Sequence, residues 1–291
     1  MPIECAELTD RAVLSVSGPE AAGFLQGLVT CNVETLQPGA AAFGALLTPQ
    51  GKILFDFFVV AVPEGYLIET PVSLAPDLAK RLKFYRLRAK VDIAERPDLR
   101  VLALQGGVPA GLPGTAYADP RLAALGARAI VPADAVPDWL AATGVTAVAT
   151  EAFRARRIAL GVPEGGLDFA YGDAFPHDAN MDDLGGVDFA KGCYVGQEVV
   201  SRMKHRGTAR RRIVQVEGDR ALPPAGTEIV AGGKTAGTLG AHAGTAGLAL
   251  LRIDRVREAI DAGQPVTAGD TSLAVALPGY ARFTWPAPAA D

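Results

Sequence analysis

The pattern of the chain changes at Arg211, and this change constrains the fold more than any other feature. From there, short apolar segments alternate with glycine turns, over 212–217, 227–231, 234–241, 246–253 and 271–276. Short strands at such spacing are typical of an all-β barrel or sandwich. The upstream part mixes helical and strand periods, and a chain of 291 residues exceeds the usual domain size of about 100–200 residues. We therefore predict two or three domains, the last of them a small all-β domain, and a frayed tail over 286–291.

Apolar spacing predicts the elements upstream of residue 211. Ser17 and Glu20 form a capping box, which predicts a short helix directly after them. Alternation or continuous apolar runs predict strands over 53–62, 66–70, 85–93 and 99–104. Helical spacing predicts helices over 73–84, 151–160 and 197–204. Residues 106–120 are rich in glycine and proline and are expected to form a loop.

Residues 161–196 show no regular period and contain eight glycines. A structureless stretch of this length in a compact protein is usually a functional loop. We therefore look for the functional site in this stretch and at its end.

Charge and hydropathy exclude several classes of protein. Lys plus Arg number 28 against 32 Asp plus Glu, a net charge of −4, so the whole chain is not a basic nucleic-acid-binding protein. No apolar run approaches the roughly 18–20 residues that span a bilayer. The N-terminus, MPIECAELTD, lacks the layout of a signal peptide. We expect a cytoplasmic protein without membrane contact.

Cysteine and histidine are sparse. Cys5, Cys31 and Cys193 are far apart, and no CxxC occurs, which argues against a disulfide framework. The three histidines have no ligand spacing, so a self-contained zinc site is not expected.

The end of the irregular stretch reads KGCYVGQE, residues 191–198. Its two glycines allow a sharp turn and a close approach to a ligand. A thiol at Cys193 would lie near the start of the next helix and near Lys191, and both favour the thiolate that ligates metals and attacks electrophiles. Tyr194 offers a ring and a hydroxyl, while Gln197 and Glu198 fall in the first helical turn. The alternative is a plain turn around a small buried cysteine.

KGCYVGQE and the RMKHRG that follows, with Arg202, His205 and Arg206, resemble the signature of the folate-binding YgfZ family. This family belongs to the superfamily of the glycine-cleavage T-protein, an aminomethyltransferase. The resemblance extends over nearly the whole chain and is weakest over 107–150. It includes GPEAAGFLQGLVTCNV (18–33), LLTPQGKILFDFFV (46–59), FYRLRAKVDI (84–93), ALQG (103–106) and FPHDANMD (175–182).

The resemblance implies a three-domain T-protein-like fold of the α+β class. Its first domain would be discontinuous, over 1–46 and 150–207, and would bind folate and carry the motif. An inserted ferredoxin-like α+β domain would cover 47–149, and a C-terminal β-barrel 208–291. The family acts in the assembly or repair of iron–sulfur proteins, including cluster-dependent tRNA-modifying enzymes, and Cys193 stands at its functionally important thiol.

The implied cofactor is tetrahydrofolate, together with a transient iron–sulfur cluster. A cluster takes about four ligands, so Cys193 as a ligand would share it with a partner, either an assembly protein or a client. The alternative is that Cys193 acts as a thiol on a damaged or transferring cluster. Direct nucleic-acid binding is not expected. The residues expected to contact cofactor are Asp56, Asp178, Lys191, Tyr194, Gln197, Glu198, Arg202 and Arg206.

Two carboxylates of this set have alternative interpretations. Asp56 is alone in an apolar strand, where a carboxylate needs a partner or a purpose. It either bonds to backbone or contacts the one-carbon unit of folate, as a carboxylate does in the related transferases; those carry an acidic pair where this chain has Phe55 and Asp56. Asp178 stands where many relatives carry Glu, and a carboxylate there suits the N–H groups of a pterin.

Cations gather in two places, six over 80–90 and seven, with His205, over 202–212. The simplest interpretation is a solvated strand face and a helix end with cations at its C-terminus. A functional alternative is a site for the glutamate tail of folate. Contact with RNA phosphates is the least favoured of the three. The main rival function is folate-dependent aminomethyl transfer, and the other is a scaffold without thiol chemistry.

Overall fold

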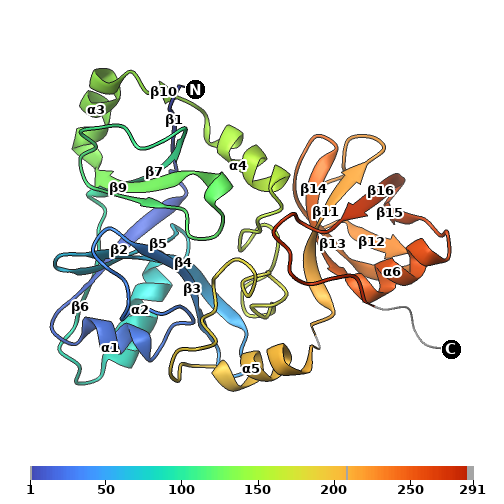
Figure 1. Ribbon diagram of the computed structural model, residues 1–291, viewed down its shortest axis with the longest axis horizontal. Coiled ribbons are helices and arrows are strands. Elements are labelled where there is room, and N and C mark those ends of the chain that lie inside the picture. The colour runs from blue at the N-terminus through green and yellow to red at the C-terminus, as the bar shows by residue number, and fades with distance from the viewer. Residues whose placement is uncertain (1, 208, 287–291) are drawn as a thin grey trace. The chain divides into compact units, whose positions relative to one another are not determined.

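The computed structural model describes residues 2–207 and 209–286, so the predicted tail, beyond Pro286, lies outside the described residues. The chain forms two compact units, each built from separate segments (Figure 1). The first unit comprises Met1–Pro49, Leu54–Phe153 and Leu184–Gln197. The second comprises Gln50–Ile53, Arg154–Asp183 and Glu198–Asp291. The boundaries expected for three domains, and the ferredoxin-like insertion over 47–149, stay a prediction.

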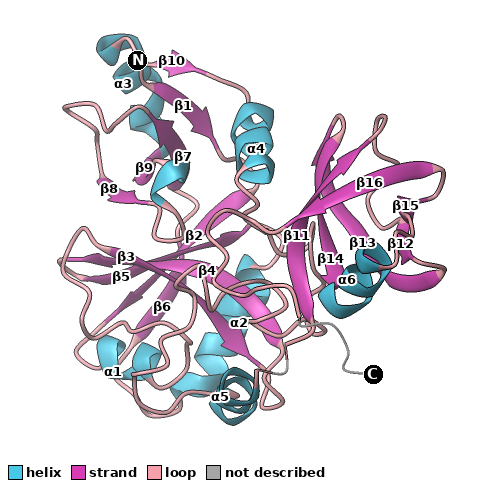
Figure 2. Cartoon of the chain, turned by 45° about the vertical axis from the view of Figure 1, so that its right-hand side comes forward, coloured by secondary structure: helices cyan, strands magenta, loops and turns pink. Residues whose placement is uncertain are grey.

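A five-stranded sheet with the order β3-β4-β5-β2-β6 lies at the centre of the first unit. Apolar side chains of α1 and α2 pack on one of its faces, in a core shared with Phe55, Phe57 and Val59. The helices therefore form one outer layer of this unit (Figure 2). The elements are β2 (Arg11–Ser17), α1 (Ala21–Gln26), β3 (Ala41–Leu47), β4 (Ile53–Val62), β5 (Gly65–Pro71), α2 (Ala75–Arg86) and β6 (Asp92–Glu95).

A second sheet of the same unit has the order β10-β1-β7-β9-β8. Val136 and Trp139 of α3 pack against one of its faces, in a small core with Leu102 and Val131. The elements are β1 (Glu4–Glu7), β7 (Leu99–Gln105), β8 (Thr115–Ala118), β9 (Ala127–Pro132), α3 (Val136–Thr143) and β10 (Thr146–Ala147), with 3-10 turns over Ala123–Leu125 and Ala133–Ala135.

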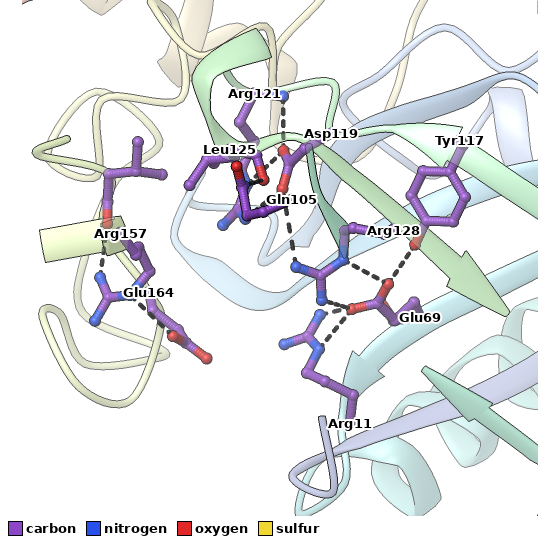
Figure 3. Close-up of polar contacts among 11 residues, drawn as sticks. Arg11, Glu69, Gln105, Tyr117, Asp119, Arg121, Leu125, Arg128, Arg157 and Glu164 are labelled. Atoms are coloured by element: carbon purple, nitrogen blue, oxygen red, sulfur yellow. Dashed lines mark hydrogen bonds and ion pairs between the residues drawn. The ribbon is translucent and has the colours of Figure 1, made fainter. Parts of the chain in front are cut away.

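A buried charge cluster joins the two sheets (Figure 3). The Glu69 carboxylate on β5, 0% exposed, accepts hydrogen bonds from Arg11 Nε at 2.8 Å and Arg128 Nε at 3.0 Å. The Tyr117 hydroxyl donates to the same carboxylate. The Arg128 guanidinium also lies 4.7 Å from the centre of the Phe58 ring. Each buried charge is thus paired and hydrogen-bonded, the condition under which charges are tolerated in a protein interior.

The second unit contains a closed barrel with the strand order β11-β14-β13-β12-β15-β16. The predicted C-terminal β-barrel is thereby confirmed, and Ile253, Val256 and Ala259 of α6 pack on its core. The strands are β11 (Arg211–Gly218), β12 (Glu228–Ala231), β13 (Lys234–Ala243), β14 (Ala246–Arg252), β15 (Val266–Ala268) and β16 (Thr271–Ala276). Helix α6 spans Ile253–Asp261; α4 (Thr150–Ala159) and α5 (Gln197–Arg206) begin at the end of first-unit segments. None of the described helices is long and apolar enough to cross a membrane.

Three local predictions are wrong. Residues 85–93 are not one strand, because α2 continues to Arg86 and β6 begins only at Asp92. The predicted loop over 106–120 contains β8. The capping box does not form; Glu20 instead accepts a hydrogen bond from the backbone N–H of Lys90. Long-range contact has replaced the local one in this last case.

Candidate functional site

The loop before the KGCYVGQE motif is fixed to the segment that follows α1. The Thr30 hydroxyl donates to the carbonyl of Gly186 at 2.6 Å, and the N–H of Asp188 donates to the carbonyl of Thr30 at 2.9 Å. The Asp188 carboxylate then accepts the N–H groups of Ala190 and Lys191 at 2.8 and 3.1 Å. This turn sets the direction in which the motif leaves the core.

Lys191 holds the motif in place. Its ammonium donates to the carbonyl oxygens of Gln26, Val29 and Cys31 at 2.8, 2.7 and 2.7 Å. An ammonium has three N–H donors, so these carbonyls use all of them. Lys191 is 8% exposed, and burial lowers the pKa of its ammonium. Its described contacts are therefore those of an anchor, and none of them reaches Cys193 or offers a donor to a ligand.

Cys193 and Tyr194 lie next to each other in different environments. The Cys193 side chain is exposed, whereas Cys5 and Cys31 are buried. Tyr194 is 7% exposed, and burial raises the pKa of its hydroxyl to about 12. Within the described chain this hydroxyl has no hydrogen-bond partner, although buried polar groups are nearly always paired. The motif thus combines an accessible thiol with a buried, unpaired phenol.

The two motif glycines have different roles. Gly196 has a φ of +80°, a left-handed conformation that favours glycine, and it turns the chain into α5 at Gln197. Gly192 shows no positive φ, and a Cβ there would meet nothing within 4 Å. The sharp turn expected of both glycines is required of Gly196 alone.

Asp56 is buried in β4 and shares a face of the strand with Phe58, because side chains alternate along a strand. Its neighbour Phe55 points the other way, into the core beneath α1 and α2. The single acid expected in this strand is therefore on the face opposite the hydrophobic core.

Asp178 belongs to the second unit and is held by two donors. Its Oδ2 accepts the backbone N–H of Phe175 at 3.0 Å and the Arg211 guanidinium at 2.7 Å. The backbone carbonyl of Asp178 accepts the N–H of Ile213 in β11 at 3.1 Å. These contacts involve Oδ2 and the backbone carbonyl, and none of them uses Oδ1 of the carboxylate.

Glu198, Arg202 and Arg206 lie on α5 at the surface. Glu198 and Arg202 form an exposed i,i+4 ion pair at 2.5 Å, a type of pair worth about 0.3–0.5 kcal/mol. Arg206 is exposed in the last turn. In this structure the three residues have the contacts of a solvated helix face.

The predicted residues fall into two groups. Asp56, Lys191, Cys193, Tyr194 and Gln197 belong to the first unit, and Lys191 lies 5.4 Å from the centre of the Tyr194 ring. The other four belong to the second unit: Asp178, Glu198, Arg202 and Arg206. Over 2–207 and 209–286, no group of three or more His, Cys, Asp or Glu side chains is placed to hold a metal ion.

Sequence reasoning missed the residues that orient the motif loop and Asp178. Thr30 and Asp188 fix the loop, and Arg211 bonds Asp178; none of the three was a candidate on its own. Asp188, three residues before Lys191, could have been found as a turn-forming acid. The partners of Lys191 are backbone carbonyls, which leave no signal in side-chain identity.

The fold defines the class of the protein. A glycine cleavage system aminomethyltransferase T from Bartonella henselae superposes with a TM-score of 0.72 over 95% of this chain and 85% of that chain, at 15% identity. Residues 210–283 match the family model of the CAF17 C-terminal beta-barrel domain. The predicted α+β class and T-protein-like fold with a C-terminal barrel are therefore confirmed.

Sequence comparison identifies the family. The human mitochondrial iron–sulfur cluster assembly factor IBA57 is 32% identical and is matched over 97% of this chain and 85% of its own length. The mitochondrial IBA57 homologue of Chaetomium globosum is 34% identical, over 73% of this chain and 56% of its own length. The chain belongs to the IBA57 family of iron–sulfur cluster assembly factors.

The family corrects one prediction. The relatives are named as mitochondrial proteins, so the expected cytoplasmic location is wrong. That expectation rested on an N-terminus without a signal-peptide pattern, and the lack of such a pattern does not identify a compartment.

Proposed function

We propose that this chain acts in iron–sulfur cluster assembly, with Cys193 as a ligand of a cluster that a partner protein holds at the same time. The proposal is carried by one observation: Cys193 is the exposed cysteine of the three, and it lies two residues from the buried anchor Lys191. The names of the relatives support the role in assembly. A rigid loop that presents a thiol can add a ligand without reorganisation of the chain.

The remaining cluster ligands come from another molecule. A cluster takes about four ligands, and Cys5 and Cys31 are buried, which raises their pKa to about 11 and about 12 and disfavours the thiolate that binds metals. The partner is an assembly protein or a client that receives the cluster, such as a tRNA-modifying enzyme. The protein's role is then to stabilise a cluster in transit.

Tetrahydrofolate is the proposed cofactor, and residues in each unit suit parts of it. In the first unit, Tyr194 has a buried hydroxyl without a described partner. In the second unit, the side-chain contacts of Asp178 use its Oδ2. A carboxylate suits the N–H groups of a pterin edge, and Asp56 is a second buried acid. Arg206 is an exposed cation for the glutamate tail. The resemblance of KGCYVGQE to the folate-binding YgfZ family supports the same assignment.

Aminomethyl transfer is not favoured. The transferases of the superfamily carry an acidic pair where this chain has Phe55 and Asp56. Phe55 is buried in the core with α1 and α2, where an acid would be costly. One of the two acids is therefore absent from the position that the chemistry uses.

Anaerobic reconstitution tests the role of Cys193. Iron and sulfide are added to the wild-type protein and to the Cys193→Ser and Cys5→Ala variants, with and without glutathione as an external thiol, and the visible spectrum is recorded. We expect glutathione-dependent cluster absorbance in the wild type and in Cys5→Ala, and none in Cys193→Ser. Unchanged uptake by Cys193→Ser, or a full cluster kept by the purified protein alone through gel filtration, contradicts the proposal.

Folate binding has its own test. Tetrahydrofolate is titrated under anaerobic conditions into the wild type and into Asp178→Asn, with Asp98→Asn, which changes an exposed carboxylate paired with Arg96, as the control. The loss of a hydrogen bond to a charged group, about 1.5–3 kcal/mol, should weaken binding by about 10- to 100-fold in Asp178→Asn. The control should bind as the wild type does. Equal affinities in all three proteins would remove Asp178 from the site.

A further inference from the structure

The C-terminal end of α2 and the turn after it combine unpaired positive charge with exposed apolar side chains. We name residues 80–90 the basic–apolar patch. Phe84 is 70% exposed and Leu87 is 87% exposed. The patch contains no acid, and all its cations are exposed: Lys80, Arg81, Lys83, Arg86, Arg88 and Lys90. Throughout the described part of the chain, none of the six has an ion-pair partner.

The fold explains the position of some of the cations, but it does not explain why Phe84 and Leu87 are exposed. Cations in the last turn of a helix are stabilised by its dipole, which accounts for Lys83 and Arg86. Leu87 has a φ of +47° and a ψ of −105°, a strained conformation for a residue other than glycine. A glycine there would relieve this strain and remove exposed apolar surface. Packing within the described chain therefore does not account for the exposed side chain of Leu87.

The Phe84 ring is presented in a fixed position. It contacts the ring of Tyr85 edge to face, with the ring centres 5.8 Å apart, and Tyr85 packs against the core beneath the helices. Val195, two residues after Cys193, packs against the same core. The basic–apolar patch and the Cys193 loop are thus supported by one rigid core, as a surface that docks a cluster partner would need.

We propose that the basic–apolar patch docks a partner protein whose surface offers carboxylates around an apolar pocket. Charge complementarity supplies the argument, since six cations without a described ion-pair partner lie around two exposed apolar side chains. Aromatic anchors within a polar rim are typical of interfaces. The proposal rests on the proposed function only in that an assembly factor must bind other proteins.

Two other anionic occupants fit less well. A membrane would need an apolar helix face, but Leu78, Ala79 and Leu82 of α2 are buried in the core. Single-stranded nucleic acid is bound by successive stacking on several aromatic rings. Phe84 is the one aromatic among the large exposed apolar residues of the described chain. Both occupants are nevertheless included in the test.

The test uses a fluorescein-labelled synthetic peptide in which glutamates alternate with leucines. Two matched peptides replace either the glutamates by glutamine or the leucines by serine. Binding is followed by fluorescence anisotropy with the full-length wild type and with two double variants, Phe84→Ser/Leu87→Gly and Lys83→Glu/Arg88→Glu. Ile260→Ser, which removes an exposed apolar side chain of α6, is the control.

We expect the wild type and Ile260→Ser to bind the glutamate–leucine peptide more tightly than either matched peptide. Both double variants should bind it with an affinity lower by about tenfold or more. Phe84→Ser/Leu87→Gly should melt no lower than the wild type, because it removes strain. Equal binding by the variants overturns the proposal. The proposal is also overturned if the patch binds phosphatidylserine vesicles, oligothymidylate or, in sedimentation, a second copy of the chain more strongly than it binds the acidic peptide.

The outcome is separate from that of the proposed function. Cys193→Ser should bind the peptide as the wild type does, since the thiol is not part of the patch. Conversely, the Phe84→Ser/Leu87→Gly variant should still take up a cluster with glutathione as the external thiol. If the wild type does not bind the peptide but still takes up a cluster, the docking proposal is rejected and the proposed role of Cys193 is not affected.

Discussion

The ammonium of Lys191 lies 2.7 Å from the carbonyl oxygen of Cys31, a residue 160 positions earlier in the chain. The motif that carries the exposed thiol is therefore tied to the segment after α1 through backbone groups. The cation of the motif acts as an anchor in this arrangement, and Cys193, two residues later, is presented by it.

Replacement of Lys191 by methionine should destabilise the protein strongly. Three buried carbonyls would lose a charged donor, and an unsatisfied buried polar group costs about 1–3 kcal/mol. We expect the free energy of unfolding to fall by about 3 kcal/mol or more in urea titrations. Lys234→Met, which removes an exposed cation paired with Glu258, should change it by less than about 1 kcal/mol. Equal effects of the two substitutions would show that the three carbonyl contacts do not stabilise the loop.

The thiols should differ sharply in reactivity. Burial raises the pKa of Cys5 to about 11 and that of Cys31 to about 12, and a buried thiol is also inaccessible, whereas Cys193 is exposed. Since the thiolate is the reactive form, N-ethylmaleimide at neutral pH should modify one cysteine of the native protein, identified as Cys193 by peptide mass spectrometry. All three should react in guanidinium chloride. Rapid native labelling at Cys31 would contradict the burial of its side chain.

Sequence periodicity predicted well where one pattern extends over a whole element. The apolar run 53–62 is β4 with the same bounds, and the irregular stretch 161–196 contains no described helix or strand. The alternation over 85–93 misled because positions four apart share a face in both a helix and a strand. Tyr85 and Ala89 pack on one core through the helix end and its turn. Leu87, between them, is exposed, which a half-buried strand does not allow.

Helix α6 was missed although the sequence carries a signal for it. Ile253, Val256 and Ala259 follow helical spacing, but residues 246–253 were predicted as a strand, which includes the first residue of the helix.

The contacts of the site were beyond sequence reasoning for a different reason. The Lys191 anchor had no such signal, since its partners are main-chain oxygens. The thiol, the tyrosine and the glycine turn were found because the motif places them together; their burial and pairing depend on segments far away in the chain.

The buried Glu69 carboxylate should make the free energy of unfolding depend on pH in the acidic range. Burial alone raises the pKa of Glu69, but Arg128 and Arg11 outweigh it and hold the pKa at about 2. The pKa of a glutamate in an unfolded chain is about 4.3. Between the two pKa values the unfolded chain therefore binds more protons than the folded one. The contribution of Glu69, roughly 3 kcal/mol, is thus present above about pH 4.3 and is lost as the pH falls through 2.

The Glu69→Gln variant separates this effect from general acid denaturation. Without the carboxylate, Arg128 keeps a buried charge with less compensation, so the variant should lose about 3–5 kcal/mol at pH 7. Its stability should also fall less steeply than that of the wild type between about pH 4.3 and 3. Glu258→Gln, in an exposed pair with Lys234, is the control and should leave the profile nearly unchanged. Parallel profiles for Glu69→Gln and the wild type would exclude Glu69 as the titrating group.

Any side chain at Gly44 should clash with the side chain of Cys31. A Cβ at Gly44 in β3 would lie 2.5 Å from the Cys31 sulfur and 3.1 Å from its Cβ, closer than packed atoms approach. Gly44→Ala should therefore destabilise the protein by about 1–3 kcal/mol, the usual range for overpacking. Because Cys31 also offers its carbonyl to Lys191, the displacement should reach the motif loop and increase amide hydrogen exchange over 184–197.

The Gly44→Ala/Cys31→Ala double variant tests this mechanism directly. Removal of the sulfur makes room for the new methyl group, so the double variant should be more stable than the sum of the single effects predicts, by about 1 kcal/mol or more. The four proteins of this cycle are compared by urea unfolding at neutral pH, and exchange over 184–197 should return toward the wild-type rate in the double variant. Strict additivity would mean that Gly44 is needed for the backbone of β3 and not for the close approach of Cys31. In that case exchange in the motif loop should be the same in Gly44→Ala with and without the sulfur.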